Sequence, residues 1–308
     1  MKKLIFFYSL VFSLTSFANN DSLKKIDVGL FVEDIYNIDY KKSSYDVVFW
    51  TWVNSKDEYY DLENYLDVIK STNVVYSNHL QTKLKSGLFH SEIKIKATIL
   101  NQFDLRKFPF DVQNISLNVE YIKYQSDKFL LNWDKKNSRF APEYIEQWKY
   151  KNIQTLQKVN QYKSNFGNTD FKQITKYKSL KTEISLERNQ WNIFMKLFLT
   201  LFVSFLLAST SVFLPNKLSQ EKIGLIVGAL FTTIGNKYIT DDLLPIQNYL
   251  NISDLIHLLT IGFITLFAIF AIYEQRKSVK DDLKFDTKLF LISSLSYIIL
   301  IILFIQLA

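Results

Sequence analysis

One segment of the 308-residue chain, residues 221–242, has residue types and spacing suited to attracting ions. If the segment is helical, residues three or four positions apart share one face. That face would carry small residues around a large ring, with a carboxylate at each end: Glu221, Gly224, Gly228, Phe231, Gly235, Tyr238 and Asp242. In a ring of identical subunits, the carboxylates would attract cations and Phe231 would form an apolar constriction. A second interpretation stays open, in which Gly224 and Gly228 let another helix pack closely.

The sequence contains none of the enzyme motifs that we considered. There is no glycine-rich phosphate loop and no His-Glu-x-x-His motif. The histidines His79, His90 and His257 stand alone, and no pair of carboxylates is marked out for acid–base work. The chain has no cysteine, which excludes disulfides and thiolate metal ligands. We therefore expect no enzymatic activity, no cofactor and no metal site.

The charge of the chain does not indicate a nucleic-acid partner. The net charge is +7, from 37 basic and 30 acidic residues. The basic residues are scattered among Asp and Glu rather than gathered in one block, which is typical of a solvated surface.

Four segments after residue 190 are apolar and long enough to cross a bilayer. They are residues 191–214, 223–239, 255–273 and 288–307. The second is the least apolar, because it contains three Gly, two Thr, an Asn and a Lys. Such a helix is poorly suited to lipid and favours protein neighbours or water.

The termini and turns predict how the chain sits in its membrane. Residues 1–18 have the basic start, short apolar run and small final residue of a signal peptide. An uncleaved anchor is the alternative, and either one exports the next segment. Basic residues cluster in two turns that we expect in the cytoplasm: Lys217 and Lys222 in one, and Arg276, Lys277, Lys280 and Lys284 in the charged turn 274–286. This pattern predicts a multi-pass protein of a bacterial inner membrane, with residues 19–190 in the periplasm.

Residues 19–190 read as short strands of alternating polarity, typical of a β-sandwich. The clearest runs are residues 28–36, 45–53, 92–101, 112–124 and 177–186. Residues 57–71 instead have apolar residues at helical spacing. No flexible linker separates this domain from residues 191–308, so we expect a joint at residues 187–190 that can transmit force.

The run Phe108-Pro109-Phe110-Asp111-Val112-Gln113 resembles the signature loop of pentameric ligand-gated ion channels, the Cys-loop receptor superfamily. Bacterial members of that family lack the cysteines, as this chain does. The resemblance extends to Trp52, to Arg188, and to Glu221-Lys222-Ile223, which is similar to the start of the pore helix in cation-selective receptors. It implies a β-sandwich extracellular domain followed by a four-helix transmembrane bundle.

The resemblance also implies roles for individual residues. Asp39, Asp111 and Arg188 would form a charged cluster at the joint, beside Phe108, Pro109 and Phe110. This cluster would pass motion of the head to the loop from Asp242 to Pro245. Glu221 would be a selectivity ring and Phe231 a gate, in a homopentamer embedded in a lipid bilayer and permeable to cations.

A ligand site between neighbouring heads is implied as well. Its aromatic candidates, which could hold a cation against their rings, are Tyr121, Tyr124, Phe166 and Phe171. The chain departs from the family in three respects. A Trp-x-Pro element is not visible between Trp52 and residue 92, Val47 stands where many receptors have an aromatic residue, and the first span has no proline before Pro215.

The function that these patterns favour is a cation channel opened by a small-molecule ligand or by protons. Asp34 and His257 are the candidates for proton sensing, because burial or neighbours can move a carboxylate or a histidine toward neutral pH. The alternative is a non-conducting sensor, in which the periplasmic domain binds a ligand and the helices only anchor and oligomerise it.

Overall fold

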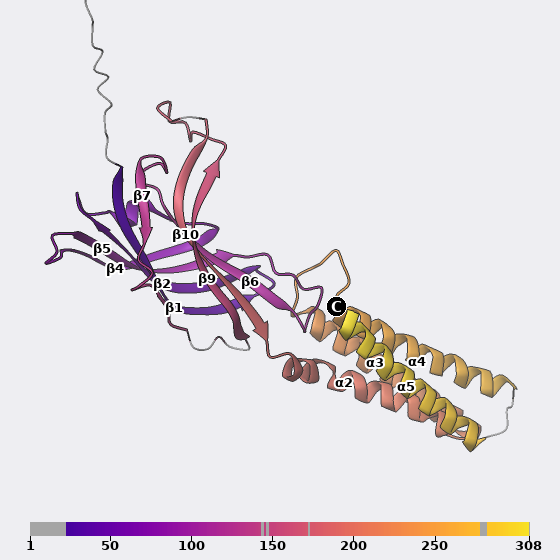
Figure 1. Cartoon of the computed structure of the whole chain (residues 1–308). Helices are drawn as coiled ribbons and strands as arrows, with labels where there is room; N and C mark the ends of the chain where they lie inside the picture. Colours follow the sequence, from indigo (N-terminus) through magenta and orange to yellow (C-terminus); the bar gives the residue numbers. More distant parts are fainter. Residues whose placement is uncertain (1–22, 143–144, 146–147, 172, 278–281, 308) are drawn as a thin grey trace, which may run out of the picture.

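The computed structural model describes residues 23–142, 145, 148–171, 173–277 and 282–307. The predicted signal peptide at residues 1–18 and Lys280 lie outside this part of the chain. The described residues form a head of β-strands and a bundle of long helices, arranged end to end (Figure 1).

The head consists of two sheets. In one, the strands are ordered β4–β5–β2–β1–β7, and the short β8 pairs with β1. Their bounds are β1 Lys24–Asp39, β2 Ser44–Ser55, β4 Ser71–Lys83, β5 Phe89–Leu100, β7 Phe129–Trp133 and β8 Arg139–Phe140. The other sheet has the order β3–β6–β10–β9, with β3 Leu66–Val68, β6 Val112–Tyr121, β9 Trp148–Tyr162 and β10 Thr175–Arg188. All pairings are antiparallel except those of β1 with β7 and β8.

Alternating polarity explains why these segments form strands. In β5, Ile93, Ile95 and Ile99 are buried, while the intervening Lys94 is only partly covered. Apolar residues from both sheets join one core, as Val47 of β2 and Leu117 of β6 illustrate. Two sheets that bury their facing sides in this way form a β-sandwich, which confirms the predicted fold of the head.

The predicted helix at residues 57–71 is wrong except for one turn. Helix α1 spans only Leu62–Tyr65, and the side chain of Asp61 caps it by accepting a hydrogen bond from the backbone of Asn64. The chain then enters β3, in which Leu66 and Val68 are buried and pair with β6. Burial against the core at every second residue outweighs the helical spacing of this short segment.

Four helices in the described residues are long and apolar enough to cross a membrane. They are α2 Gln190–Thr210, α3 Ser219–Asp241, α4 Ile252–Lys277 and α5 Leu283–Leu307. Two short 3₁₀ turns, η1 Ser211–Phe213 and η2 Asn216–Leu218, connect α2 to α3. The helices lie side by side, and α5 ends near the head (Figure 1). The protein is therefore a multi-pass membrane protein with a sandwich head.

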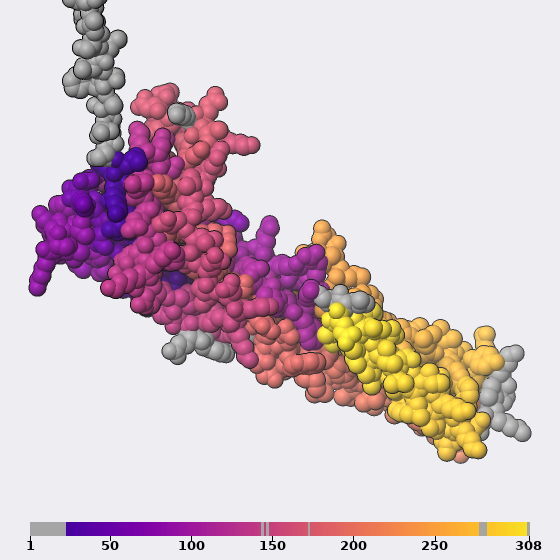
Figure 2. Space-filling view, in the orientation of Figure 1, coloured from indigo at the N-terminus to yellow at the C-terminus, as the bar shows by residue number. Residues whose placement is uncertain are grey.

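The joint between the two parts is short, as predicted. Strand β10 ends at Arg188 and α2 begins at Gln190, so only Asn189 lies between them. The signature loop also contacts the helices, because the Phe110 ring lies 5.3 Å from the Phe194 ring in α2. The β9–β10 hairpin projects from the opposite end of the head (Figure 2).

Candidate functional site

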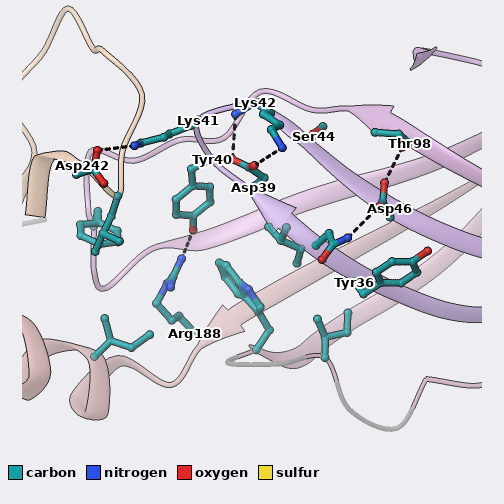
Figure 3. Close-up of a pocket in the computed structure, with 17 residues that line it drawn as sticks. Tyr36, Asp39, Tyr40, Lys41, Lys42, Ser44, Asp46, Thr98, Arg188 and Asp242 are labelled. Carbon is teal, nitrogen blue, oxygen red and sulfur yellow. Dashed lines mark hydrogen bonds and ion pairs between the residues drawn. The ribbon is translucent and has the colours of Figure 1, made fainter. Parts of the chain in front are cut away.

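A pocket of about 850 Å³ lies where the head meets the helices (Figure 3). Besides polar residues of β1, β2 and β5, three segments that are distant in sequence meet in its lining. The β1–β2 loop contributes Tyr40 and Lys41, the end of β10 contributes Arg188, and the end of α3 contributes Asp242. The pocket therefore joins the head to the helix whose exposed face the sequence singled out.

Arg188 and Asp111 meet in this region, with side chains only 8% and 1% exposed. The Arg188 Nε lies 3.5 Å from Asp111 Oδ1. A shorter path runs through Tyr40, whose hydroxyl accepts from Arg188 Nη2 at 2.5 Å and donates to Asp111 Oδ2 at 2.6 Å. Figure 3 shows the guanidinium directed at this hydroxyl. Tyr40 is thus the bridge between the two charges.

Aromatic rings enclose the Arg188 guanidinium. Its central carbon lies 4.4 Å from the ring centroid of Trp148, 5.1 Å from that of Tyr40 and 5.5 Å from that of Phe108. Ring faces at these distances attract a cation, more strongly when water is excluded. Burial, and then the nearby Asp111 carboxylate, raise the pKa of Tyr40, so its hydroxyl stays protonated and remains a donor.

The predicted place of Asp39 in this cluster is wrong. Its carboxylate instead accepts from the backbone N–H of Lys42 at 3.0 Å and lies 3.5 Å from Lys42 Nζ. The register of β1 against β2 shifts between Tyr36 and Asp39. Consequently Tyr40, rather than Asp39, reaches Asp111.

A second link connects the β1–β2 loop to α3. Lys41 Nζ lies 2.7 Å from Asp242 Oδ1, and both side chains are well exposed. Pro109 is buried beside Phe108, and Pro245 is partly buried in the loop that follows Asp242. Of the residues predicted for the joint, Phe108, Asp111 and Arg188 meet in one cluster, and Phe110 packs against α2. Asp39 lines the same pocket but pairs with Lys42.

Helix α3 has two distinct faces. One packs inside the subunit and includes Ile226, Ala229 and Thr233. The other is exposed in the isolated subunit, and it contains all the residues predicted to share one face: Glu221, Gly224, Gly228, Phe231, Gly235, Tyr238 and, just past the helix end, Asp242. No described atom lies within 4 Å of a Cβ built at Gly224 or Gly228, apart from the helix itself and their chain neighbours. Close packing at these glycines therefore does not occur within one subunit.

The expectation that Lys222 lies in the turn before the second span is wrong. Lys222 belongs to the first turn of α3 and is 3% exposed. Its Nζ lies 2.7 Å from Oε2 of Glu274, which belongs to α4 rather than to the predicted charged turn. The buried position makes this a pair within the membrane bundle.

Tyr121 does not belong to an accessible ligand site. Its side chain is fully buried in the sandwich, and its hydroxyl lies 2.9 Å from Thr51 Oγ1. Tyr124 is partly exposed, and its hydroxyl donates to Glu58 at 2.5 Å. This bond, followed by that from Lys123, lowers the pKa of Glu58 to about 2. Tyr124 therefore takes part in a local ion network, and Tyr121 is a core residue.

The β9–β10 hairpin holds a more suitable group of aromatic residues. The exposed Phe166 lies 5.6 Å from the Tyr162 ring, which lies 6.2 Å from Tyr177. Phe171 lies in the same hairpin loop and is partly buried. At the base of the hairpin, the buried Glu120 accepts from Tyr162 Oη at 3.0 Å and from Asn160 Nδ2 at 2.7 Å.

Glu120 was not singled out from the sequence. Burial raises its pKa above the ordinary 4.5, although the two hydrogen bonds oppose the shift. The sequence contains no distinct signal for it, because Asn118 and Glu120 alternate with Leu117, Val119 and Tyr121 as in an ordinary strand with one polar side. Because neighbouring residues of a strand point to opposite sides, Glu120 faces the hairpin when Tyr121 faces the core.

The two residues proposed as proton sensors have different surroundings. Asp34 is exposed, and its carboxylate accepts from the backbone N–H of Ile35. His257 is fully buried in α4. Its Nδ1 lies 2.7 Å from the Ser253 carbonyl and its Nε2 lies 2.9 Å from Asn236 Oδ1.

Comparison with known proteins identifies the class. Residues 62–190 match the family described as the neurotransmitter-gated ion-channel ligand binding domain. No curated protein matches the chain. A head of this family followed by four membrane-crossing helices is the architecture of a pentameric ligand-gated ion channel. The family match of the head, the four membrane-crossing helices and the absence of cysteine together fit a cysteine-free channel of that class.

Proposed function

We propose that five copies of the chain form a cation-selective channel, opened from the head and lined by the exposed face of α3. The two-faced burial of α3 carries this proposal. One face is covered by its own subunit, whereas Phe231 and Tyr238 on the other are 71% and 74% exposed.

The composition of the exposed face favours a pore over lipid. Glu221 at the inner end of α3 and Asp242 just past its outer end are exposed charges. Charged groups within a membrane are costly unless they face water or a partner. A closed ring of identical subunits would turn these faces toward one axis. Carboxylate rings would then favour cations, and Phe231 would form an apolar constriction.

Gating would pass through the head–membrane joint. A rotation of the head would move Arg188, and the single residue Asn189 would pass that motion to α2. The Tyr40 bridge and the Lys41–Asp242 pair would carry it to the outer end of α3. Packed contacts of this kind, with two alternative arrangements, can couple distant sites.

The stimulus would act at the base of the β9–β10 hairpin. A buried carboxylate below three aromatic rings suits a small organic ammonium ion. The raised pKa of Glu120 suits protonation as well. Asp34 and His257 remain candidates for proton sensing, but Glu120 combines burial with bonds to the hairpin. The predicted signal peptide supports an inner-membrane location with the head in the periplasm.

Current measurement in planar bilayers tests this function. The purified oligomer, placed between unequal KCl solutions, should give a reversal potential near that of K⁺. Glu221→Gln should reduce the preference for cations. Glu183→Gln, an exposed carboxylate in β10 far from the helices, should leave the preference unchanged. Absence of current between about pH 4 and pH 8, which brackets ordinary Glu and His pKa values, and with a panel of small amines, would favour the non-conducting sensor.

A further inference from the structure

A buried ion pair lies directly behind the inner end of the proposed pore. Lys222 Nζ and Glu274 Oε2 are 2.7 Å apart, and their side chains are 4% and 8% exposed. Asn216 Oδ1 also lies 3.5 Å from the same ammonium. The pair joins the first turn of α3 to the last turns of α4.

The position of Lys222 creates an electrostatic problem for a cation pore. Lys222 follows Glu221, so the two charges enter α3 at nearly the same level, rotated by about 100°. Glu221 is exposed and Lys222 is buried. Ions passing Glu221 would lie within the Debye length of the Lys222 charge, about 10 Å in 0.1 M salt. An unpaired Lys222 would therefore cancel much of the field of Glu221.

Glu274 removes this conflict. With Glu274 ionised, Glu221, Lys222 and Glu274 together give each subunit one net negative charge at this level. Without Glu274, the charges of Glu221 and Lys222 sum to zero in each subunit. Lys217 and Arg276 lie at the same end of the bundle, but they are exposed to solvent, where salt screens them.

Packing alone does not explain the pair. Apolar residues of similar volume often stabilise a buried position as well as an ion pair does. Stability therefore does not require the charge of Glu274.

We propose that Glu274, which lies on α4 and outside the pore, determines ion selectivity by neutralising Lys222, so that Glu221 sets the sign of the permeant ion. Glu274 acts through Lys222 and does not touch the ions. The inference rests on the proposed function, because it requires that Glu221 line a cation pore.

The test compares two variants that differ only in the counter-charge. A buried lysine with a neutral partner can lose its proton, whereas arginine stays charged. Lys222→Arg should keep the cation-to-anion permeability ratio of the unmodified channel. Lys222→Arg with Glu274→Gln should lower that ratio about tenfold or more, because the net charge that repels anions disappears. An unchanged ratio in this double variant would overturn the proposal.

Two further variants separate charge from structure. Lys222→Gln with Glu274→Gln is neutral at both positions and should retain the original ratio, and a loss there would show a structural role instead. If the arginine variant does not assemble, Lys222→Gln alone decides, because it removes the opposing charge whether Glu274 stays ionised or takes up a proton. Its cation preference should be equal or greater, and a fall would overturn the proposal.

The proposed function fails separately from this inference. An unmodified channel without current, or with a selectivity that Glu221→Gln does not change, contradicts the cation pore itself. When Glu221→Gln lowers selectivity and the Lys222→Arg, Glu274→Gln variant does not, only the role of Glu274 is rejected.

Discussion

Two buried ion pairs lie near opposite ends of the membrane helices, and their geometries differ. At the inner end, Lys222 and Glu274 make direct contact at 2.7 Å. At the head end, Arg188 and Asp111 are 3.5 Å apart at their closest charged atoms, and Tyr40 bridges them. Among the described residues, the Arg188 Nε and the Asp111 Oδ1 have no hydrogen-bond partner.

In the proposed channel, this difference would separate a fixed end from a movable one. A short direct pair in a buried setting has one favoured arrangement. A bridged cluster with an unfilled donor and an unfilled acceptor has groups that can exchange partners. In the proposed function, the head end is also where a stimulus would reach the helices. We therefore interpret the inner pair as an anchor and the Tyr40 cluster as the moving joint.

The largest effect is expected when one charge of the outer pair is removed. Arg188→Met leaves the Asp111 carboxylate buried without its counter-charge, which typically costs about 3–5 kcal/mol. Thermal unfolding of the detergent-solubilised oligomer measures this loss. Lys42→Met removes the partner of the more exposed Asp39 and should cost less than about 1 kcal/mol. If the two variants lose the same stability, the outer cluster stabilises the protein no more than an exposed ion pair does.

Tyr40→Phe tests whether the hydroxyl is the bridge. It keeps the ring beside Arg188 but removes the acceptor of Arg188 Nη2, at a cost of about 1–3 kcal/mol. Asp111 Oδ2 loses one of its two donors and keeps Gln113 Nε2. Because the bridge fixes the end of β10 one residue before α2, the concentration of proton or ligand that opens the proposed channel should shift. Tyr45→Phe is the matched control, since the Tyr45 hydroxyl is buried without a partner among the described residues. Equal effects of both changes would argue against a bridge.

The pH dependence of the head should be sensitive to Glu120. Because its folded pKa is raised, the folded head holds the proton more tightly than the unfolded chain. Its contribution to stability is therefore full below the ordinary pKa of 4.5 and is lost as the pH rises through the folded pKa. Glu120→Gln should raise the thermal stability at pH 7 and give no gain at low pH. A gain of the same size at both pH values would contradict the assignment.

The smallest effect is expected at the exposed link between loop and helix. Lys41→Ala removes the pair with Asp242, and both side chains are exposed, so the cost should be about 0–1 kcal/mol and smaller in high salt. Unfolding at low and high KCl checks this. A loss as large as that for Arg188→Met would place the main coupling at Lys41.

The sequence predicts what depends on periodicity and on a specific local motif. The face shared by Glu221, Phe231 and Asp242 follows from helical spacing, and the alternation in β5 follows from strand geometry. The meeting of Asp111 with Arg188 was implied by the resemblance of the signature loop.

Two errors concern neighbouring residues. Tyr40, rather than Asp39, contacts Asp111, because the β1–β2 register shifts just before them. Glu120, rather than Tyr121, faces the hairpin, because neighbouring strand residues face opposite sides. A single sequence shows neither the register shift nor which side of the strand faces the core.

Long-range partners account for the other errors. Lys222 beside a polar turn resembles a solvated residue, and its partner Glu274 is 52 positions away. Residues 57–71 have apolar residues at helical spacing, but pairing with β6 draws residues 66–68 into the sheet. Both outcomes are decided by tertiary contacts that local patterns do not contain.

Electron microscopy of the solubilised oligomer tests directly whether five subunits surround a pore lined by α3. We predict five-fold symmetry, with the exposed face of α3 around the axis and the Phe231 rings at a constriction. Any other symmetry, or a ring in which that face of α3 meets lipid, would contradict the account.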